Sequence, residues 1–107
     1  MNFGLRFLFG AEVATMFEVT VCVDVFFGKK KFNTYQRTIS MPFIPYPQTS
    51  LVLDGFHEII KVETLRWCDT NETEKIAAFG KVTYNKYAIA DAEFLQKMLR
   101  RSNWKKW

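Results

Sequence analysis

The segment "FEVTVCVDVFF", residues 17–27, constrains the fold of this chain more than any other stretch. Apolar residues occupy every second position from Phe17 to Val25, and residues such as glutamate, threonine and aspartate lie between them. This two-residue period is typical of a strand that buries one face. Gly28 and three lysines follow, and a second alternating run continues from Phe32 to Met41. The pattern predicts an antiparallel hairpin with a solvated, lysine-rich tip.

The stretch "PFIPYPQTSLVLDGF", residues 42–56, contains all three prolines of the chain and predicts a corner rather than a catalytic site. Proline cannot donate a backbone hydrogen bond to a sheet, so this stretch ends the second strand. Near its end, Asp54 and Gly55 stand between apolar residues, which is a strong signal for a type I′ turn. The sequence therefore predicts a tight hairpin centred on these two residues.

Two candidates for contact with a ligand or partner follow this turn. A two-residue turn pairs His57 with Val52 on the outer face of the sheet, and it places Glu58 on the face of the apolar residues. Glu58 then either faces a ligand at the mouth of a barrel or reaches solvent at the end of the sheet. Trp67, further along the next strand, completes this first group of candidate contact residues.

The segment after the turn predicts two further strands. Its apolar positions shift from even to odd numbers between Val62 and Leu65. A β-bulge near residues 63–64 restores the buried face and helps a sheet to curl. After the polar turn "CDTNETE", a last strand covers residues 76–84, with Gly80 as a bend. The whole pattern predicts a mainly β, α+β fold: a small five-stranded antiparallel barrel or curled sheet.

The C-terminal region predicts an amphipathic helix that begins near Asp91, a good N-cap residue. Phe94 and three further apolar residues up to Leu99 share one face, and the bases near the end suit the helix dipole. In one interpretation the helix only caps an open end of the barrel. In the other, "RRSNWKKW" alternates tryptophans with bases so as to bind nucleic acid or an anionic membrane surface. The candidate nucleic-acid contacts are Lys97, Arg100, Arg101, Trp104, Lys105, Lys106 and Trp107.

The charge of the chain is concentrated at this C-terminal end. Of the fifteen Lys and Arg, five fall within residues 97–107, whereas none of the eleven Asp and Glu does. Residues 1–96 therefore carry a net charge of −1, although the whole chain carries +4. A barrel that binds nucleic acid on its sheet usually carries a basic stripe there. The sequence predicts no such stripe on the body of this domain.

The two cysteines and the single histidine are too few for the usual four-ligand zinc site. We therefore expect no metal and no cofactor. Cys22 and Cys68 fit reduced thiols of a cytoplasmic protein, with one disulfide between them as the alternative.

The length of 107 residues favours a single domain, with an arm at residues 1–15, a β-barrel at 16–84 and a helix at 90–104. The arm weakly resembles a signal peptide, but Glu12 interrupts it. We expect a loosely docked arm, or a natural start at Met16. No stretch approaches the roughly 20 apolar residues of a membrane span, so we expect no integral membrane association.

Residues 16–84 resemble small uncharacterised bacterial β-barrel proteins of SH3-like build. The order of a valine-rich strand, a hairpin, "PFIP", "LDGFHEIIKVETLRW", an acidic turn and a last strand carries this likeness. The resemblance implies an SH3-like barrel and brings no catalytic residues with it. Its most specific positions are Pro42, Phe43, Pro45, Gly55, Val62 and Trp67.

Composition and motifs favour a binding function over catalysis. Hydrophobic residues make up 49% of the chain and include eleven phenylalanines, which is more apolar surface than one small domain easily hides. We expect a homodimer and a non-enzymatic binding or protein-interaction module. The alternative is an accessory nucleic-acid-binding protein that uses the basic, tryptophan-containing C-terminal tail.

Overall fold

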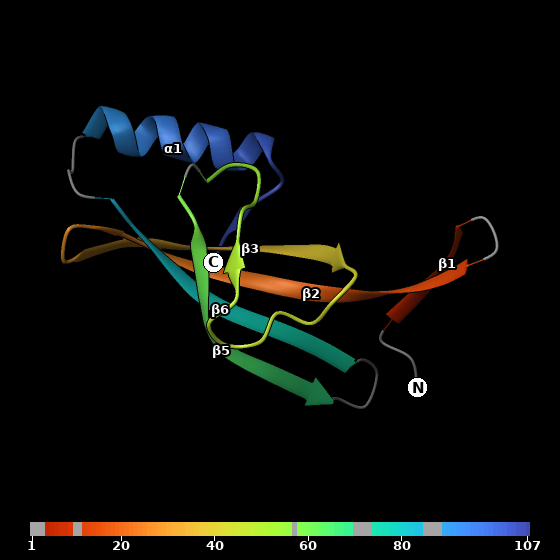
Figure 1. Cartoon of the computed structure of the whole chain (residues 1–107). Coiled ribbons are helices and arrows are strands. Elements are labelled where there is room, and N and C mark those ends of the chain that lie inside the picture. The colour runs from red at the N-terminus through yellow and green to blue at the C-terminus, as the bar shows by residue number, and fades with distance from the viewer. Residues whose placement is uncertain (1–3, 10–11, 57, 70–73, 85–88) are drawn as a thin grey trace.

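A computed structural model of the chain describes residues 4–9, 12–56, 58–69, 74–84 and 89–107. The fold is mainly β with one helix, α1, near the C-terminus (Figure 1). The elements are β1 (Gly4–Phe9), β2 (Glu12–Phe27), β3 (Lys30–Met41), β4 (Ser50–Leu51), β5 (Ile60–Asp69), β6 (Glu74–Tyr84), α1 (Ile89–Arg101) and β7 (Lys105–Lys106).

The strands form one mixed sheet in the order β4-β5-β6-β2-β3-β7, and β1 pairs with β2 outside that path. The five expected strands correspond to β2 to β6, whereas β1 and β7 were not expected. The prediction of an all-antiparallel sheet is wrong, because β6 pairs with β2 in parallel. The parallel pair arises because residues 42–49 carry the chain from β3 to the other side of β2. A closed barrel is not confirmed, since β4 and β7 end the path and do not pair with each other among the described residues.

The predicted hairpin of β2 and β3 is confirmed, as is its buried face. Val19, Val21, Val23 and Val25 are all buried in the core. A two-residue turn at Gly28 and Lys29 joins the strands, with Phe27 paired to Lys30.

The tight type I′ hairpin predicted at Asp54 and Gly55 is wrong. Leu51 pairs with Ile60, so an eight-residue loop, residues 52–59, joins β4 to β5. Within it, the Phe56 amide donates to the Leu53 carbonyl at 3.3 Å, and Gly55 alone of the two central residues has a positive φ, +98°. A positive φ at only the second central position is the pattern of a type II turn.

The predicted β-bulge in β5 is confirmed, because the pairing of β5 with β6 shifts between Val62 and Thr64. Gly80 lies opposite Val62, next to the bulge. A Cβ atom on Gly80 would stand 2.7 Å from the Lys61 carbonyl oxygen and 2.9 Å from Ile60 Cγ2. The absence of a side chain there allows the two backbones to approach closely.

The C-terminal helix is confirmed, with different bounds and a different buried stripe. It begins at Ile89, so Asp91 is the third helical residue rather than the N-cap, and it ends at Arg101. Ala92, Leu95 and Leu99 face the core, whereas Phe94 is 60% exposed. The predicted placement of Phe94 on the buried face is wrong because the stripe that packs on the sheet follows positions i, i+3 and i+7.

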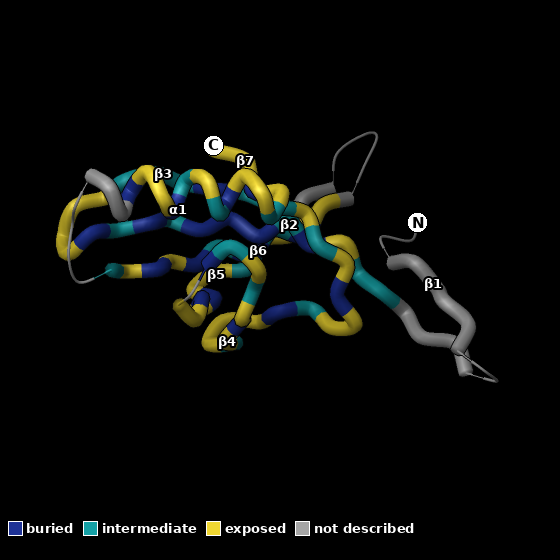
Figure 2. Tube along the Cα trace, turned by 90° about the horizontal axis from the view of Figure 1, so that it is seen from above, coloured by how far each residue is buried: buried dark blue, intermediate teal, exposed yellow. Residues whose placement is uncertain are grey.

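The core lies between one face of the sheet and a cover made of α1 and the 52–59 loop. One cluster of buried residues joins the valines of β2 to Phe56 of the loop, Leu99 of α1 and Trp104. Figure 2 shows the buried part of β2 beneath the helix.

The expected N-terminal arm is a two-stranded ribbon in which β1 pairs with residues 12–17 of β2. Figure 1 shows this ribbon reaching away from α1 and the rest of the sheet. Among the described residues, no helix is long and apolar enough to cross a membrane.

Candidate functional site

The sheet has one face covered by α1 and the 52–59 loop, and one open face. Because side chains alternate along a strand, the residues between the buried valines of β2 point to the open face. Residues paired across neighbouring strands share a face, so the register assigns the remaining side chains. The strand pairing, rather than the sequence alone, therefore shows which side chains lie on the open face.

Basic side chains gather on this open face. Lys81 of β6 is an example, because it pairs with Asp24 of β2 on one side and with Lys61 of β5 on the other. The same register brings in Arg66, opposite Ala77, and Lys105, opposite Gln36. The described side chains of this face include six bases, Lys31, Lys61, Arg66, Lys75, Lys81 and Lys105, and two acids in regular pairing, Glu18 and Asp24; a third acid, Glu63, is exposed in the bulge of β5 next to Thr64.

One of the two acids is already paired. Asp24 Oδ1 lies 3.2 Å from Lys31 Nζ and accepts a hydrogen bond of 2.6 Å from the Thr34 hydroxyl. Lys31–Asp24 is the only ion pair within the described part of the chain. Both side chains are about half exposed, so the pair contributes little to stability. The other bases of the open face keep their charge available to an external anion.

Aromatic groups lie among these bases. The Arg66 guanidinium carbon stands 5.3 Å from the centre of the half-buried Phe79 ring, a cation–π contact in the middle of the sheet. At the edge, the Trp107 amide donates to the Thr34 carbonyl at 2.8 Å, which extends the pairing of β7 along β3. Trp107 is 67% exposed and follows Lys105 by two residues, so it lies on the same face.

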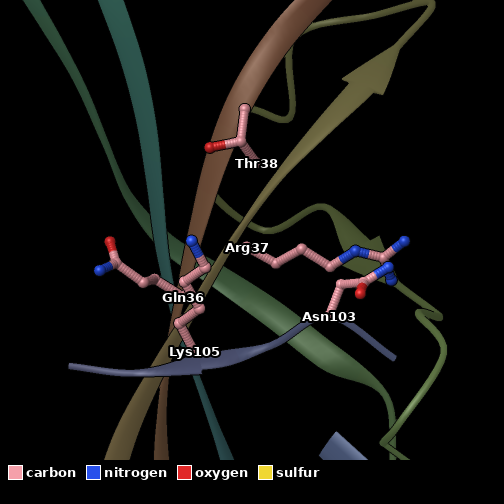
Figure 3. Close-up of a pocket in the computed structure, with 5 residues that line it drawn as sticks. All are labelled: Gln36, Arg37, Thr38, Asn103 and Lys105. Carbon is pink, nitrogen blue, oxygen red and sulfur yellow. The ribbon is translucent and has the colours of Figure 1, made fainter. Parts of the chain in front are cut away.

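A shallow pocket of about 450 Å³ opens at the edge formed by β3 and β7. Two cations, Arg37 and Lys105, line it together with the neutral polar residues Gln36, Thr38 and Asn103. Arg37 and Asn103 extend side by side to one side of β3, and Gln36 extends to the other (Figure 3). No acid lines this pocket, so its electrostatic preference is for an anion.

A second cavity of about 490 Å³ lies beside the first, between α1 and the 52–59 loop. Arg37 and Asn103 line both cavities, and Arg101 adds a third cation to the group. Asp54 is the one acid that lines the second cavity. Arg37 therefore stands at the junction of the two cavities.

The end of α1 places Asn103 and Trp104 by a Schellman motif. Asn103 takes a left-handed φ of +66°, and its amide donates to the Arg100 carbonyl at 3.2 Å. The Trp104 amide donates to the Leu99 carbonyl at 2.9 Å. These are the two hydrogen bonds of that motif, with asparagine in the position that glycine usually takes. The reversal sends Trp104 into the core and leaves Asn103 at the pocket.

Trp104 was predicted to contact nucleic acid, and the structure corrects this. Its side chain is 3% exposed, and the ring meets Phe56 edge-on at 4.9 Å between centroids. The indole Nε1 donates to the Asp54 carbonyl at 2.7 Å. With both ring faces buried, Trp104 cannot stack on a base, and it instead ties the 52–59 loop to the end of α1.

The other predicted nucleic-acid contacts are exposed but do not form one tail. Lys105 and Lys106 make up β7 and Trp107 continues along β3, whereas Lys97, Arg100 and Arg101 lie on α1 on the covered side of the sheet. The predicted group therefore divides between two surfaces.

Of the three predicted ligand or partner contacts, Glu58 and Trp67 line neither of the two cavities described above. Glu58 is exposed in the 52–59 loop, and His57 lies outside the described residues. Trp67 is 59% exposed and pairs with Ile76 on β6. The sequence analysis did not identify Arg37, Arg66 or Phe79 as site residues. The signal that could have found them is their position in strands whose side chains alternate between the two faces.

Cys22 is the buried thiol of the open face. Burial, and to a smaller extent the charge of Asp24, raises the pKa of this thiol above its ordinary value of 9.0. The thiol therefore stays protonated near neutral pH and is not an activated nucleophile. Cys22 is free rather than bonded to Cys68. Within the described residues, no group of three or more His, Cys, Asp or Glu is placed to hold a metal ion.

Comparison of the chain with family models, with curated proteins and with solved structures finds no match.

Proposed function

We propose that the protein is a non-enzymatic binding module whose ligand is a single-stranded nucleic acid, held across the open face of the sheet. One observation carries this proposal: the strand register collects six bases on a single uncovered face, against two acids in regular pairing and Glu63 at the bulge of β5. A surface of this kind attracts a polyanion and releases its counterions on binding. In this proposal the open face of the sheet takes the place of the C-terminal tail, which the sequence offered as the alternative site for nucleic acid.

The aromatic groups support a single strand rather than a duplex, because only unpaired bases can stack on a protein ring. Phe79 lies on β6 and Trp107 lies beside β3, at the β7 position. With strands about 4.8 Å apart, three spacings separate these two rings by about 14 Å across the sheet. Two different bases of one strand can therefore contact Phe79, with its Arg66, and Trp107.

The pocket at the edge of β3 and β7 suits a phosphate of the same strand. Arg37 and Lys105 provide two positive charges, and the Asn103 amide provides a neutral hydrogen-bond donor. Gln36 and Lys105 belong both to this pocket and to the open face, so the two parts are continuous.

We further propose that the domain is related to the small bacterial SH3-like β-barrel proteins and that it works in the cytoplasm. The likeness rests on the sequence motifs around Pro42, Gly55 and Trp67.

The test is a fluorescence-anisotropy titration of a labelled single-stranded oligonucleotide at several salt concentrations. The variant Lys61→Gln/Lys81→Gln removes two charges from the open face, and the matched control Lys97→Gln/Arg100→Gln removes two exposed charges from α1. For two lost phosphate contacts, we expect the slope of log K against log salt to fall by about 1.4 in the first variant. The control is expected to bind as the wild type does.

Two aromatic variants separate stacking from simple charge attraction. Phe79→Ala and Trp107→Ala each remove one ring, at an expected cost of about 1–3 kcal/mol of binding free energy. The proposal is wrong if the wild type fails to bind, if the α1 control loses as much affinity as the open-face variant, or if duplex DNA binds as tightly as a single strand.

A further inference from the structure

The pocket at the edge of β3 and β7, here the edge pocket, reaches from the open face of the sheet to its covered side. Arg37 pairs with the buried Val21, so its side chain lies on the covered side, whereas Lys105 lies on the open face (Figure 3). β7 pairs with residues 35–36 of β3 only, so among the described residues the edge of β3 at 37–41 has no strand partner. A nucleic-acid strand that crosses the open face can therefore pass over this edge to Arg37.

The edge pocket and the second cavity together are lined by three cations and one acid. Lys105 lines the edge pocket, Arg101 lines the second cavity, and the half-buried Arg37 lines both. Asp54 lines the second cavity alone. Neither Arg37 nor Arg101 forms an ion pair with another described residue. The two cavities therefore have a surplus of two positive charges that no described acid neutralises.

This surplus favours a phosphate monoester over a phosphodiester of the strand interior. A phosphodiester carries one negative charge, whereas a monoester carries nearly two at neutral pH and offers three acceptor oxygens. A guanidinium group can donate to two of these oxygens at once. In a single-stranded nucleic acid, a monoester occurs only at an end of the strand. The charge of the two cavities is therefore matched by a terminal phosphate.

The second cavity has the size and the lining for the base that belongs to this phosphate. Its volume of about 490 Å³ falls within the roughly 300–1,000 Å³ of small-ligand sites. Leu53, Phe56 and Met98 provide apolar walls, and Asp54 and Ser102 provide hydrogen-bond acceptors. The Asp54 carboxylate can accept from an amino group of a base, and it does not line the pocket that takes the phosphate.

We propose that the two cavities together hold the terminal nucleotide of the bound strand, with its phosphate monoester beside Arg37 in the edge pocket and its base in the second cavity. This inference rests on the proposed binding of a single strand, and it specifies that the phosphate in the edge pocket is a terminal one. A 5′ phosphate and a 3′ phosphate share this chemistry, so the experiment tests the two ends separately.

The experiment is a competition at about pH 7.5, followed by fluorescence anisotropy, in which unlabelled oligonucleotides displace one internally labelled strand. Three versions of one sequence are compared: with a 5′ phosphate, with a 3′ phosphate, and with hydroxyl groups at both ends. In the wild type we expect one phosphorylated version to bind about tenfold tighter than the hydroxyl version. Arg101→Gln is expected to reduce this preference to about threefold or less, and Arg37→Gln is expected to remove it.

Two controls separate recognition of the strand end from general charge attraction. Arg100→Gln removes the neighbouring exposed charge of α1, which lines neither cavity, and is expected to keep the full preference. Lys61→Gln/Lys81→Gln is expected to weaken the binding of all three versions equally and to leave their ratio unchanged.

The inference is wrong if the wild type binds the three versions equally, or if Arg100→Gln lowers the preference as much as Arg101→Gln does. Either result leaves the proposed single-strand binding in place, provided that the binding weakens with salt and depends on Lys61 and Lys81. If none of the three versions binds, the proposed function and this inference are both wrong.

Discussion

Replacing Gly55 by alanine tests whether the 52–59 loop is held in place by the end of α1. A Cβ atom on Gly55 would stand 3.1 Å from Leu99 Cδ2, 3.1 Å from Trp104 Cδ1 and 3.2 Å from Ser102 Cβ. The φ of +98° adds backbone strain, because a residue with a side chain rarely adopts this conformation. Gly28 is a matched control, since its φ is +62° and a Cβ there would meet nothing within 4 Å.

The two substitutions differ in steric contact, because only Gly55→Ala places a methyl group against neighbouring side chains. Gly28→Ala costs backbone strain alone, about 1–2 kcal/mol for a left-handed residue. Gly55→Ala costs strain of about 1–3 kcal/mol, plus about 1–3 kcal/mol for forcing a methyl group into a closed contact. The leucine methyl can move, whereas the indole carbon is fixed by the Trp104–Asp54 hydrogen bond. We therefore expect Gly55→Ala to lose about twice the stability that Gly28→Ala loses.

Thermal melts followed by circular dichroism measure the difference. For a domain of this size, 1 kcal/mol lowers Tm by about 4–8 °C. Gly28→Ala is expected to melt roughly 5–10 °C below the wild type, and Gly55→Ala at least 10 °C below it. Equal melting temperatures for the two variants would refute the packing of Gly55 against α1.

Two further predictions concern Trp104 and Cys22. Trp104→Phe leaves the Asp54 carbonyl without its indole donor, so urea unfolding should show that the free energy of unfolding falls by about 1–3 kcal/mol. The control Trp107→Phe changes an exposed ring and should lower it by about 0.5 kcal/mol or less. Equal losses in the two variants would contradict the buried role of Trp104. Because burial raises the pKa of the Cys22 thiol, the folded protein holds this proton more tightly than the unfolded chain does, so its contribution to stability is complete below pH 9.0 and is lost as the pH rises. When the pH is raised from about 8 to 10, the free energy of unfolding from urea titrations should therefore fall less in Cys22→Ala than in the wild type. If it falls equally with pH in both proteins, the Cys22 thiol is not buried in this way.

Local patterns in the sequence determined much of the β structure. The alternation from Phe17 to Val25 assigns the buried face of β2 correctly, because a strand reverses its side chains at every residue. The shift of the apolar positions near Glu63 locates the bulge for the same reason. The need for a glycine at position 55 was also readable, although the type of turn was not. All these features depend on neighbours within a few residues.

The candidate site could be predicted only in part. Lys105 and Trp107 were found because bases and tryptophans are adjacent in the sequence. Trp104 stands in the same motif but was placed incorrectly, because the Schellman motif at the end of α1 turns one tryptophan inward. Short motifs describe which chemical groups are available, whereas exposure depends on how the helix end packs against the 52–59 loop.

The basic open face was decided by tertiary structure alone. Residues 1–96 carry a net charge of −1, which predicted a body without a basic stripe. The net charge does not show on which face of the sheet each charged side chain lies, because each strand places half of its side chains on each face. Pairing β6 in parallel beside β2 and antiparallel to β5 places Lys81, Lys61 and Arg66 on one side of the sheet. The alternation within each strand is written in the sequence, but strand order and register are set by the packing of segments that are far apart in it.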